Sequence, residues 1–126
     1  MTYQMPEARV GQNYVAGYRP LREISADIRK AIATAKTLGQ IPADIKVSVR
    51  VRDGLAIDVK LSGWDRDQLI EAPENSWDYA RSTAAATAVR NRVEAIRESF
   101  NRDASDPMVD YYEVTYYGST SLVVPN

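Results

Sequence analysis

Two runs of alternating apolar and polar residues, on either side of Asp53-Gly54, constrain the fold more than any other feature of this chain. Alternation with a period of two is typical of β-strands that bury one face, and an Asp-Gly pair between two such runs is typical of a tight turn. The sequence therefore predicts a β-hairpin with one apolar and one polar face. The apolar positions are Ile45, Val47, Val49, Val51, Leu55, Ile57, Val59 and Leu61, and the polar ones include Lys46, Ser48, Arg50, Arg52, Asp58, Lys60 and Ser62.

The alternation also limits which residues of this hairpin can lie opposite one another. A two-residue turn at Asp53-Gly54 would place apolar residues opposite polar ones. A three-residue loop that begins at Arg52 pairs Val51 with Leu55 and keeps the branched side chains together on one face. We therefore predict a type I turn followed by a left-handed Gly54.

Two stretches with the three- and four-residue apolar spacing of amphipathic helices flank the hairpin. The first is predicted to run from about residue 22 or 25 to residue 38, with Ser25 as its cap and Gly39 as its end. The second is predicted to run from Ser76, as its cap, to about Arg102. The expected buried stripes are Leu21, Ile24, Ile28, Ala31, Ile32 and Ala35 in the first helix, and Ala85 or Ala86, Val89, Val93, Ile96 and Phe100 in the second.

A second hairpin is expected in the last part of the sequence. Residues 111–117 and 120–124 are rich in Tyr, Val and Thr, which suit strands, and Gly118-Ser119 lies between them. We expect Tyr112, Val114 and Tyr116 to face the core, and Tyr111, Glu113, Thr115 and Tyr117 to face outward.

The predicted element order is α-β-β-α-β-β. Because a helix buries one stripe and a strand one face, both helices are expected to cover the same side of the sheet. We predict an α+β fold, a two-layer sandwich in which two helices pack on one face of a four-stranded, mainly antiparallel sheet. A circularly permuted ferredoxin-like arrangement is one topology with this order. Residues 1–20 are predicted to form an N-terminal arm, and residues 21–126 a single domain.

The 126-residue chain contains neither histidine nor cysteine. This absence excludes zinc fingers, Ser-His-Asp triads, thiol enzymes and disulfide frameworks. We expect a protein that is not an enzyme, with no catalytic residues, no bound metal and no cofactor. The net charge is −1, and no apolar run approaches the roughly 20 residues of a membrane span. We therefore expect a cytoplasmic protein that does not contact a membrane.

The polar face of the first hairpin is a candidate recognition surface. It carries Lys46, Arg50, Arg52 and Lys60, and the proposed orientation of the second hairpin would add Tyr111 and Tyr117. Cations beside aromatic rings on an open sheet are typical of surfaces that bind single-stranded nucleic acid, where charge follows the phosphates and rings stack on bases. The alternative is an ordinary solvated face in which Arg50 contacts Asp58.

Two tryptophans bracket a polar stretch that is expected to be a loop. Trp64 and Trp77 lie on either side of Asp65–Asn75. Tryptophan at the end of a secondary-structure element usually anchors the core. It is also enriched where proteins bind one another. The pair therefore indicates either core anchors or a contact site for a partner protein.

Two acidic groups could in principle support chemistry. Carboxylate oxygens are the ligands of Mg²⁺ and Ca²⁺, but the spacing around Pro107 fits no EF-hand loop, so turns and caps are the simpler interpretation. In the second group, between the two tryptophans, a pair of carboxylates could serve as the catalytic residues of a glycoside hydrolase, but a solvated loop explains these residues equally well. The two groups are Asp103, Asp106, Asp110 and Glu113, and Asp65, Asp67, Glu71 and Glu74.

Three segments of the sequence resemble a known family, the large-polyvalent-protein-associated domain 29. They are Ile28–Ile32, Lys46–Arg50, and Phe100–Asp106 leading to Asp110–Tyr112, and the segment from Trp64 to Ala88 does not fit the family pattern. The resemblance implies a small α/β module of phages, plasmids and other mobile elements. It also implies a non-enzymatic protein that acts on the host, including its defences. It assigns no site residue.

These observations lead to three hypotheses for function. The leading one is a non-catalytic phage or mobile-element protein that binds a host protein through the polar sheet face or through the loop between the tryptophans. The alternative is binding of single-stranded nucleic acid by the basic sheet face. The third is a carboxylate-based, metal-dependent enzyme. The expected partner-binding residues are Lys46, Arg50, Arg52, Lys60, Trp64, Trp77, Tyr111 and Tyr117.

Overall fold

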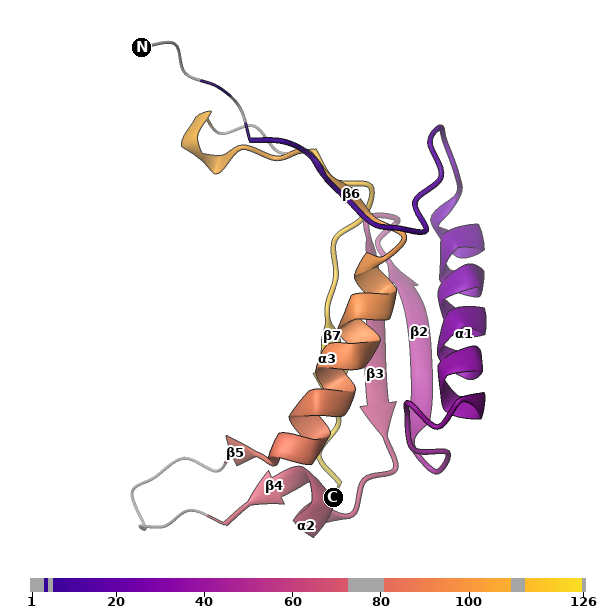
Figure 1. Ribbon diagram of the computed structural model, residues 1–126, viewed down its shortest axis with the longest axis vertical. Coiled ribbons are helices and arrows are strands. Elements are labelled where there is room, and N and C mark those ends of the chain that lie inside the picture. The colour runs from indigo at the N-terminus through magenta and orange to yellow at the C-terminus, as the bar shows by residue number, and fades with distance from the viewer. Residues whose placement is uncertain (1–3, 5, 73–80, 110–112, 126) are drawn as a thin grey trace.

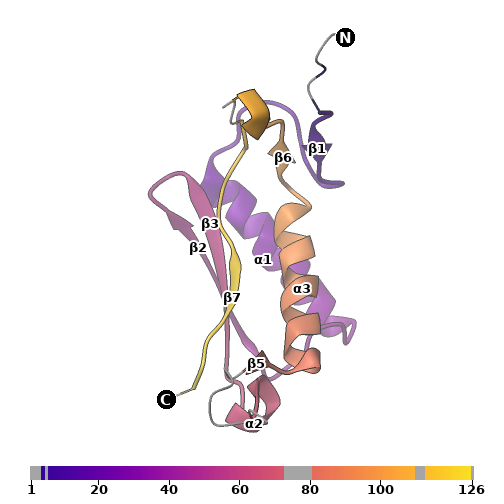
Figure 2. The same ribbon diagram turned by 90° about the vertical axis from the view of Figure 1, so that its left-hand side faces the viewer.

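The computed structural model describes residues 4, 6–72, 81–109 and 113–125, and its fold is α+β (Figure 1). At its centre is a three-stranded sheet, in the order β2 (Lys46–Arg52), β3 (Ala56–Ser62), β7 (Thr120–Leu122). Helices α1 (Leu21–Thr37) and α3 (Ala84–Glu98) lie on one side of this sheet, and no described helix covers the other side (Figure 2). The helices therefore share one face, as predicted, but the sheet has three strands and not four.

Helix α1 agrees closely with its sequence pattern. It follows Pro20, whose fixed φ of −59° suits a helix start, and Gly39 lies just beyond its end with a φ of +76°. Ser25 is not the cap, because it is buried and its hydroxyl donates to the Arg22 carbonyl at 2.8 Å. The buried positions of the helix are Ile24, Ser25, Ile28, Ile32 and Ala35.

Helix α3 is shorter than predicted at both ends. Thr83 is its N-cap and accepts a hydrogen bond from the Ala86 N–H at 3.1 Å, while the predicted cap, Ser76, lies outside the described residues. The helix ends at Glu98, and the predicted last residue, Arg102, belongs to the short strand β6 (Arg102–Asp103). From Arg102 onward the chain pairs with the N-terminal strand, and the helical spacing of apolar residues does not reveal this pairing.

The first hairpin forms as predicted, but its register is shifted by two residues. Arg52 pairs with Ala56, and Val51 with Ile57. Asp53 and Gly54 both have positive φ, +55° and +67°, and the Leu55 N–H donates to the Arg52 carbonyl at 3.0 Å. These are the features of a type I′ turn, whose twist matches that of the strands, and not of the predicted type I turn. Leu55 is the extra residue that keeps the apolar positions of both strands in phase.

The predicted second hairpin is not formed. Strand β7 pairs with β3 in parallel, with Val59 opposite Thr120, and Tyr117 already bridges Ala56 upstream. Gly118 has a φ of +126°, and a Cβ atom at this position would lie 2.1 Å from the Ile57 carbonyl oxygen. Glycine is thus needed here for a close approach of two backbones and not for a turn. The hairpin was predicted because glycine is common in both situations.

Short strands at one end of the molecule join the N-terminal segment to the end of α3. Strand β1 (Arg9–Val10) pairs antiparallel with β6, and Val114 bridges Asp103. The chain after Val114 then passes to the central sheet and becomes β7. Beyond β6 lies the 3₁₀ turn Pro107–Val109. The predicted arm therefore contributes a strand, and its described residues do not cover the helix-free side of the sheet (Figure 2).

The stretch predicted as a polar loop contains structure at the other end of the molecule. It includes the one-turn helix α2 (Arg66–Leu69) and strand β4 (Ile70–Glu71), which pairs antiparallel with β5 (Arg81–Ser82). Asp65 caps α2, because its side chain and that of Gln68 satisfy each other's backbone N–H groups. The polar residues of this stretch, which suggested a loop, therefore include the cap of a one-turn helix.

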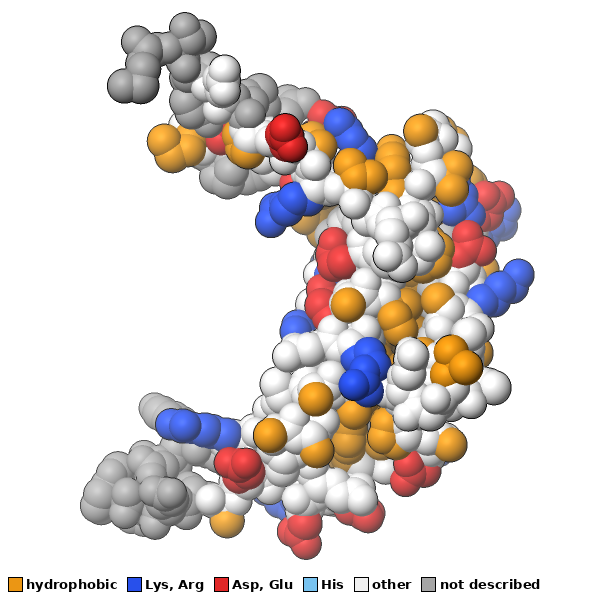
Figure 3. Space-filling model, viewed as in Figure 1, with side chains coloured by type: hydrophobic (Ala, Val, Ile, Leu, Met, Phe, Trp, Pro, Cys, Tyr) orange, Lys and Arg blue, Asp and Glu red, His pale blue; other side chains and the backbone are white. Residues whose placement is uncertain are grey.

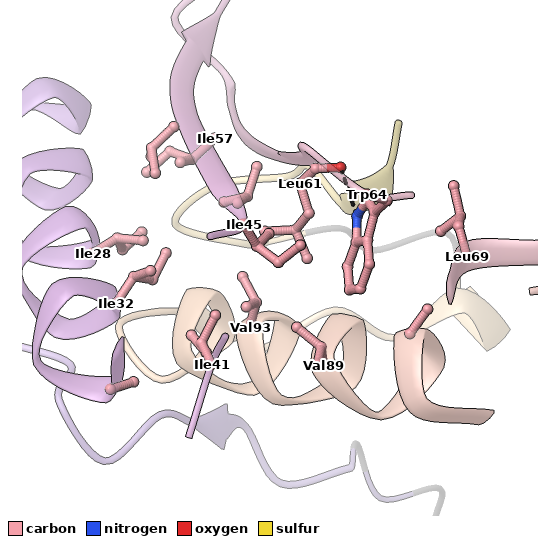
Figure 4. Packing of buried hydrophobic residues seen from close by; sticks show 14 of the residues in the cluster. Ile28, Ile32, Ile41, Ile45, Ile57, Leu61, Trp64, Leu69, Val89 and Val93 are labelled. Atoms are coloured by element: carbon pink, nitrogen blue, oxygen red, sulfur yellow. Dashed lines mark hydrogen bonds between the residues drawn. The ribbon is translucent and has the colours of Figure 1, made fainter. Parts of the chain in front are cut away.

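The hydrophobic core lies between the two long helices and the sheet (Figure 4). Ile28, Ile57 and Leu61 are completely buried, and Trp64 is 8% exposed. The buried cluster is Ile24, Ile28, Ile32, Ala35, Ile41, Ile45, Val49, Ile57, Val59, Leu61, Trp64, Leu69, Ala86, Val89, Val93 and Tyr116.

Cationic side chains from the two helices bind outward-facing carbonyl groups at both edges of the central sheet. Unpaired edge carbonyls are sites at which another strand can add, so these contacts oppose lengthening of the sheet. The contacts are Arg29 Nη2 to Val49 O at 2.6 Å, Lys36 Nζ to Ile45 O, and Arg90 Nε to Thr120 O at 3.0 Å.

Candidate functional site

The helix-free side of the central sheet carries a row of polar side chains from each strand. Residues that pair directly in a ladder place their side chains on the same face, so the register defines this surface. We call it the outer face. It comprises Lys46, Ser48, Arg50 and Arg52 from β2, Ala56, Asp58, Lys60 and Ser62 from β3, and Tyr117, Ser119 and Ser121 beside β3.

The carboxylate of Asp58 is fully engaged within the outer face. It accepts a hydrogen bond from Arg52 Nε at 2.6 Å and another from the Ser119 N–H at 3.2 Å. The hydrogen bond from Arg52 lowers the pKa of Asp58, against a smaller opposing effect of burial, and the Ser119 N–H lowers it further. Asp58 is therefore an ionised partner of Arg52, and it holds the segment before β7 against β3.

Arg50 has no such partner, although Asp58 lies directly opposite it in the ladder. Lys46, Arg50 and Lys60 are all exposed and form no ion pair with any described residue. The predicted contact between Arg50 and Asp58 is thus replaced by the contact between Arg52 and Asp58. Three unpaired cations remain on one open surface.

Two of these cations, Arg50 and Lys60, line a shallow depression with a volume of about 410 Å³. Ser48 lies between them, and the Arg52–Asp58 pair lies at one end. The depression is also lined by the carboxylates of Asp53 and Asp58, and Asp58 is already bound to Arg52. Arg50, Lys60 and the Ser48 hydroxyl are the donors that suit a carboxylate or phosphate group.

Among the described residues, one aromatic side chain is on the outer face. Tyr117 bridges Ala56, so it shares the face with Arg52 and Asp58, and it is 51% exposed. Tyr111, the second predicted tyrosine, lies outside the described residues. Of the expected orientations, buried Tyr116 and exposed Glu113, Thr115 and Tyr117 are confirmed, and Val114 is half-buried. Tyr112 also lies outside the described residues.

Trp64 is a core anchor, which was the simpler of its two interpretations. Its ring packs between Leu61, Leu69 and Val89, and its Nε1–H donates to the Leu61 carbonyl at 3.1 Å (Figure 4). Trp77 lies outside the described residues. The structure therefore places Trp64 on the helix side of the sheet, away from the outer face.

The carboxylates around Pro107 are used in local contacts. Asp103 pairs with Arg9 at 2.7 Å, and the N–H of Ser105 and this pairing lower its pKa. Asp106 is buried and accepts from the Met108 N–H, and Glu113 pairs with Arg102 at 2.9 Å. Asp110 lies outside the described residues. Over residues 4, 6–72, 81–109 and 113–125, no three carboxylates are grouped as a metal site.

Within the described residues, the acidic side chains near α2 are not grouped as a metal site either. Asp65 is the helix cap, and Asp67 and Glu71 are exposed. Glu74 lies outside the described residues.

A buried polar cluster at the end of α3 was missed by the sequence analysis. Only 3% of the Arg97 side chain is exposed, and it binds Glu94 at 3.0 Å through Nε and Glu98 at 2.6 Å through Nη2. The hydroxyl of buried Tyr116 donates to the Arg97 carbonyl. The spacing contained a signal, because Val89, Val93 and Arg97 follow one another at four-residue intervals on the buried stripe.

Asn101 completes this cluster with a fully used side chain. Its amide donates to the Tyr116 carbonyl at 2.9 Å and to Glu98 at 3.1 Å. Its oxygen accepts the N–H groups of Tyr116 and Arg102 at 3.2 and 2.9 Å. Because every group is satisfied, the cluster fastens the last part of the chain to α3 and leaves no donor for a ligand.

No protein-family model matches the sequence, and no curated protein or solved structure matches it either. The resemblance to the large-polyvalent-protein-associated domain 29 stays a prediction from the residues. No helix within the described residues is long and apolar enough to cross a membrane. The function is therefore inferred from the geometry of the outer face.

Proposed function

We propose that this protein is a non-catalytic binding module whose outer face contacts an acidic surface of a partner protein. The observation that carries the proposal is the pairing of Asp58 with Arg52 and the Ser119 N–H, while Lys46, Arg50 and Lys60 form no ion pair with a described residue on the helix-free face of the sheet. The resemblance adds the expectation of a mobile-element protein whose partner is a host protein in the cytoplasm.

Charge distribution supports an acidic partner. The whole chain has a net charge of −1, so a cationic surface of this kind is a local feature. Complementary charges at the rim of an interface speed up association and select partners, while burial of apolar atoms and hydrogen bonds supply most of the affinity. The serines and the depression between Arg50 and Lys60 can supply those hydrogen bonds.

A charge reversal with a matched control tests the proposal. Arg50→Glu with Lys60→Glu changes the outer face, and Arg22→Glu with Lys30→Glu makes the same change in net charge on the exposed side of α1. Arg52 is left intact because its loss would free Asp58. The immobilised proteins are compared for what they retain from a host lysate, and a retained protein is then purified for a titration against salt.

We expect a partner that the native protein and the α1 variant retain and the outer-face variant loses. In the titration, the affinity of this partner should fall as salt rises, because exposed charges are screened. If both variants retain the same proteins as the native chain, the outer face is not the recognition surface.

Binding of single-stranded nucleic acid is the second candidate, and one observation favours it. Tyr117 exposes half of its surface on the same face as the cations, so a base could stack beside a bound phosphate. A labelled (dT)20 oligonucleotide should then bind with an affinity that falls steeply with salt, because bound counterions are released. Tyr117→Ala should weaken that binding. Absence of a gel shift at low salt would remove this candidate.

A further inference from the structure

A groove on the helix side of the molecule has an apolar floor and an acidic rim. It has a volume of about 380 Å³ and lies between the loop that precedes β2, helix α2 and the first turns of α3. In Figure 3, hydrophobic side chains gather on the lower part of this side, with acidic side chains below them. The groove is on the opposite side of the sheet from the outer face.

The floor of the groove is formed by core residues and by a small helix residue. Ile45, Trp64 and Val89 belong to the buried cluster and present only their outer edges here. Ala85 is exposed on α3, and its single methyl group leaves the space that a longer side chain would fill. The hollow is therefore built into packed elements, as preformed binding sites are.

The rim carries negative charge that the described part of the chain does not neutralise. Asp44 and Asp67 line the groove, are exposed, and form no ion pair with a described residue. Gln68 also lines it; its side-chain oxygen accepts the Asp65 N–H at 3.4 Å, and its amide N–H₂ makes no hydrogen bond within the described residues. The rim thus presents two carboxylates for a cation and one amide donor for a peptide carbonyl.

We propose that this groove binds a short segment of a partner protein in which one apolar side chain is flanked by lysine or arginine. The apolar side chain occupies the floor over Trp64 and Val89. The basic neighbours approach Asp44 and Asp67, and the Gln68 amide donates to the main chain of the segment. This is a second site, independent of the cationic outer face and of opposite charge.

An NMR titration with capped peptides tests the proposal. The probe is Gly-Lys-Leu-Lys-Gly, and its controls carry serine in place of leucine or glutamate in place of both lysines. We expect saturable shifts of the Trp64 indole N–H and of the Ala85 and Val89 amides. The serine peptide should bind about tenfold or more weakly, because a buried leucine side chain contributes most of the apolar area. The glutamate peptide should produce no saturable shift.

Variants of the groove complete the test. Ala85→Leu fills the floor with a residue that favours helix almost as strongly, and Asp44→Asn with Asp67→Asn removes the rim charges. Each variant should bind the probe about tenfold more weakly than the native chain, which corresponds to a loss of about 1.4 kcal/mol in binding free energy. A control variant, Glu7→Gln with Asp53→Asn, removes two distant carboxylates and should bind the probe like the native chain.

Three results would overturn the proposal. One is the absence of any saturable shift, and another is equal binding by the native chain and both groove variants. The third is equal binding of butylammonium and the leucine peptide, which would make the groove a site for small organic cations.

Discussion

Arg97 and Arg50 carry the same guanidinium group in opposite surroundings. The Arg97 side chain is 3% exposed, and two carboxylates of its own helix bind it. Arg50 is exposed, and the one carboxylate opposite it in the ladder is bound to Arg52 instead. A buried guanidinium needs partners for its five donors, whereas an exposed one is satisfied by water and can exchange that water for a ligand.

The difference separates a structural cluster from a recognition surface. Around Arg97, every described donor and acceptor of Asn101 and Tyr116 has a partner, and the result is attachment of the last strand to α3. On the outer face, Lys46, Arg50 and Lys60 form no ion pair with any residue that the structure describes. The same residue type therefore contributes to stability at one place and to binding at the other.

The largest effect on stability is expected from removing the charge of Arg97, and removal of the Arg50 charge is its control. Arg97→Met leaves Glu94 half-buried without its partner, and loss of one member of a buried pair lowers the free energy of unfolding by about 3–5 kcal/mol. The matched control, Arg50→Met, should change it by less than about 0.5 kcal/mol. Urea denaturation measures both. Equal losses in the two variants would contradict the distinction.

Acid should weaken the buried cluster before it affects the cations of the outer face. Burial is the largest single influence on the pKa of Glu94 and would raise it, but the hydrogen bond from Arg97 and the other nearby donors and cations together outweigh burial and leave this pKa below its ordinary value of 4.5. A carboxyl with a lowered pKa stabilises the fold above pH 4.5, and that contribution is lost as the pH falls through the folded-state value. Stability should therefore decrease below about pH 4.5.

Glu94→Gln isolates this contribution. The native chain should be more stable than the variant at pH 7, and the gap should narrow as the pH falls below about 4.5 in chemical denaturation at a series of pH values. A gap that is the same at pH 7 and pH 3 would show that Glu94 does not respond to Arg97.

The smallest effect on stability, and an informative effect on binding, is expected from Asp58→Asn. Ion pairs near the surface contribute about 0–1 kcal/mol, so the free energy of unfolding should change little. The substitution releases Arg52, so the outer face gains a fourth unpaired cation. We expect tighter binding of the acidic partner and a steeper dependence on salt. Weaker binding would show that the ordered Arg52–Asp58 pair itself is recognised.

The first hairpin shows what local patterns reveal. The alternation from Ile45 to Leu61 identifies both strands, and an outer face of Lys46, Arg50 and Lys60 follows from the same period. The predicted register was wrong because the period determines only which side a residue faces, and a shift of two residues leaves the sides unchanged. The positive φ of Asp53 selected the other turn.

The last strand shows what local patterns do not reveal. Gly118 is equally suited to a turn and to a close backbone approach, so its sequence context could not distinguish a hairpin from a strand beside β3. Buried Arg97 was not among the predicted core residues; arginine is rarely buried, and only its spacing from Val93 indicates otherwise. The hydrogen bond between Asp58 and the Ser119 N–H could not be predicted from local patterns, because Ser119 belongs to a distant segment of the chain.

The parallel pairing of β3 with β7 has a consequence for biosynthesis. Asp58 and Ser119 are 61 residues apart, so the middle strand acquires its second neighbour only after most of the polypeptide has left the ribosome. Until then, β3 is itself an open edge, and a nascent or truncated chain offers it to other chains as a template for aggregation. Fast closure by the late-arriving strand, aided by the small size of Gly118, is therefore a condition for a good yield of folded protein.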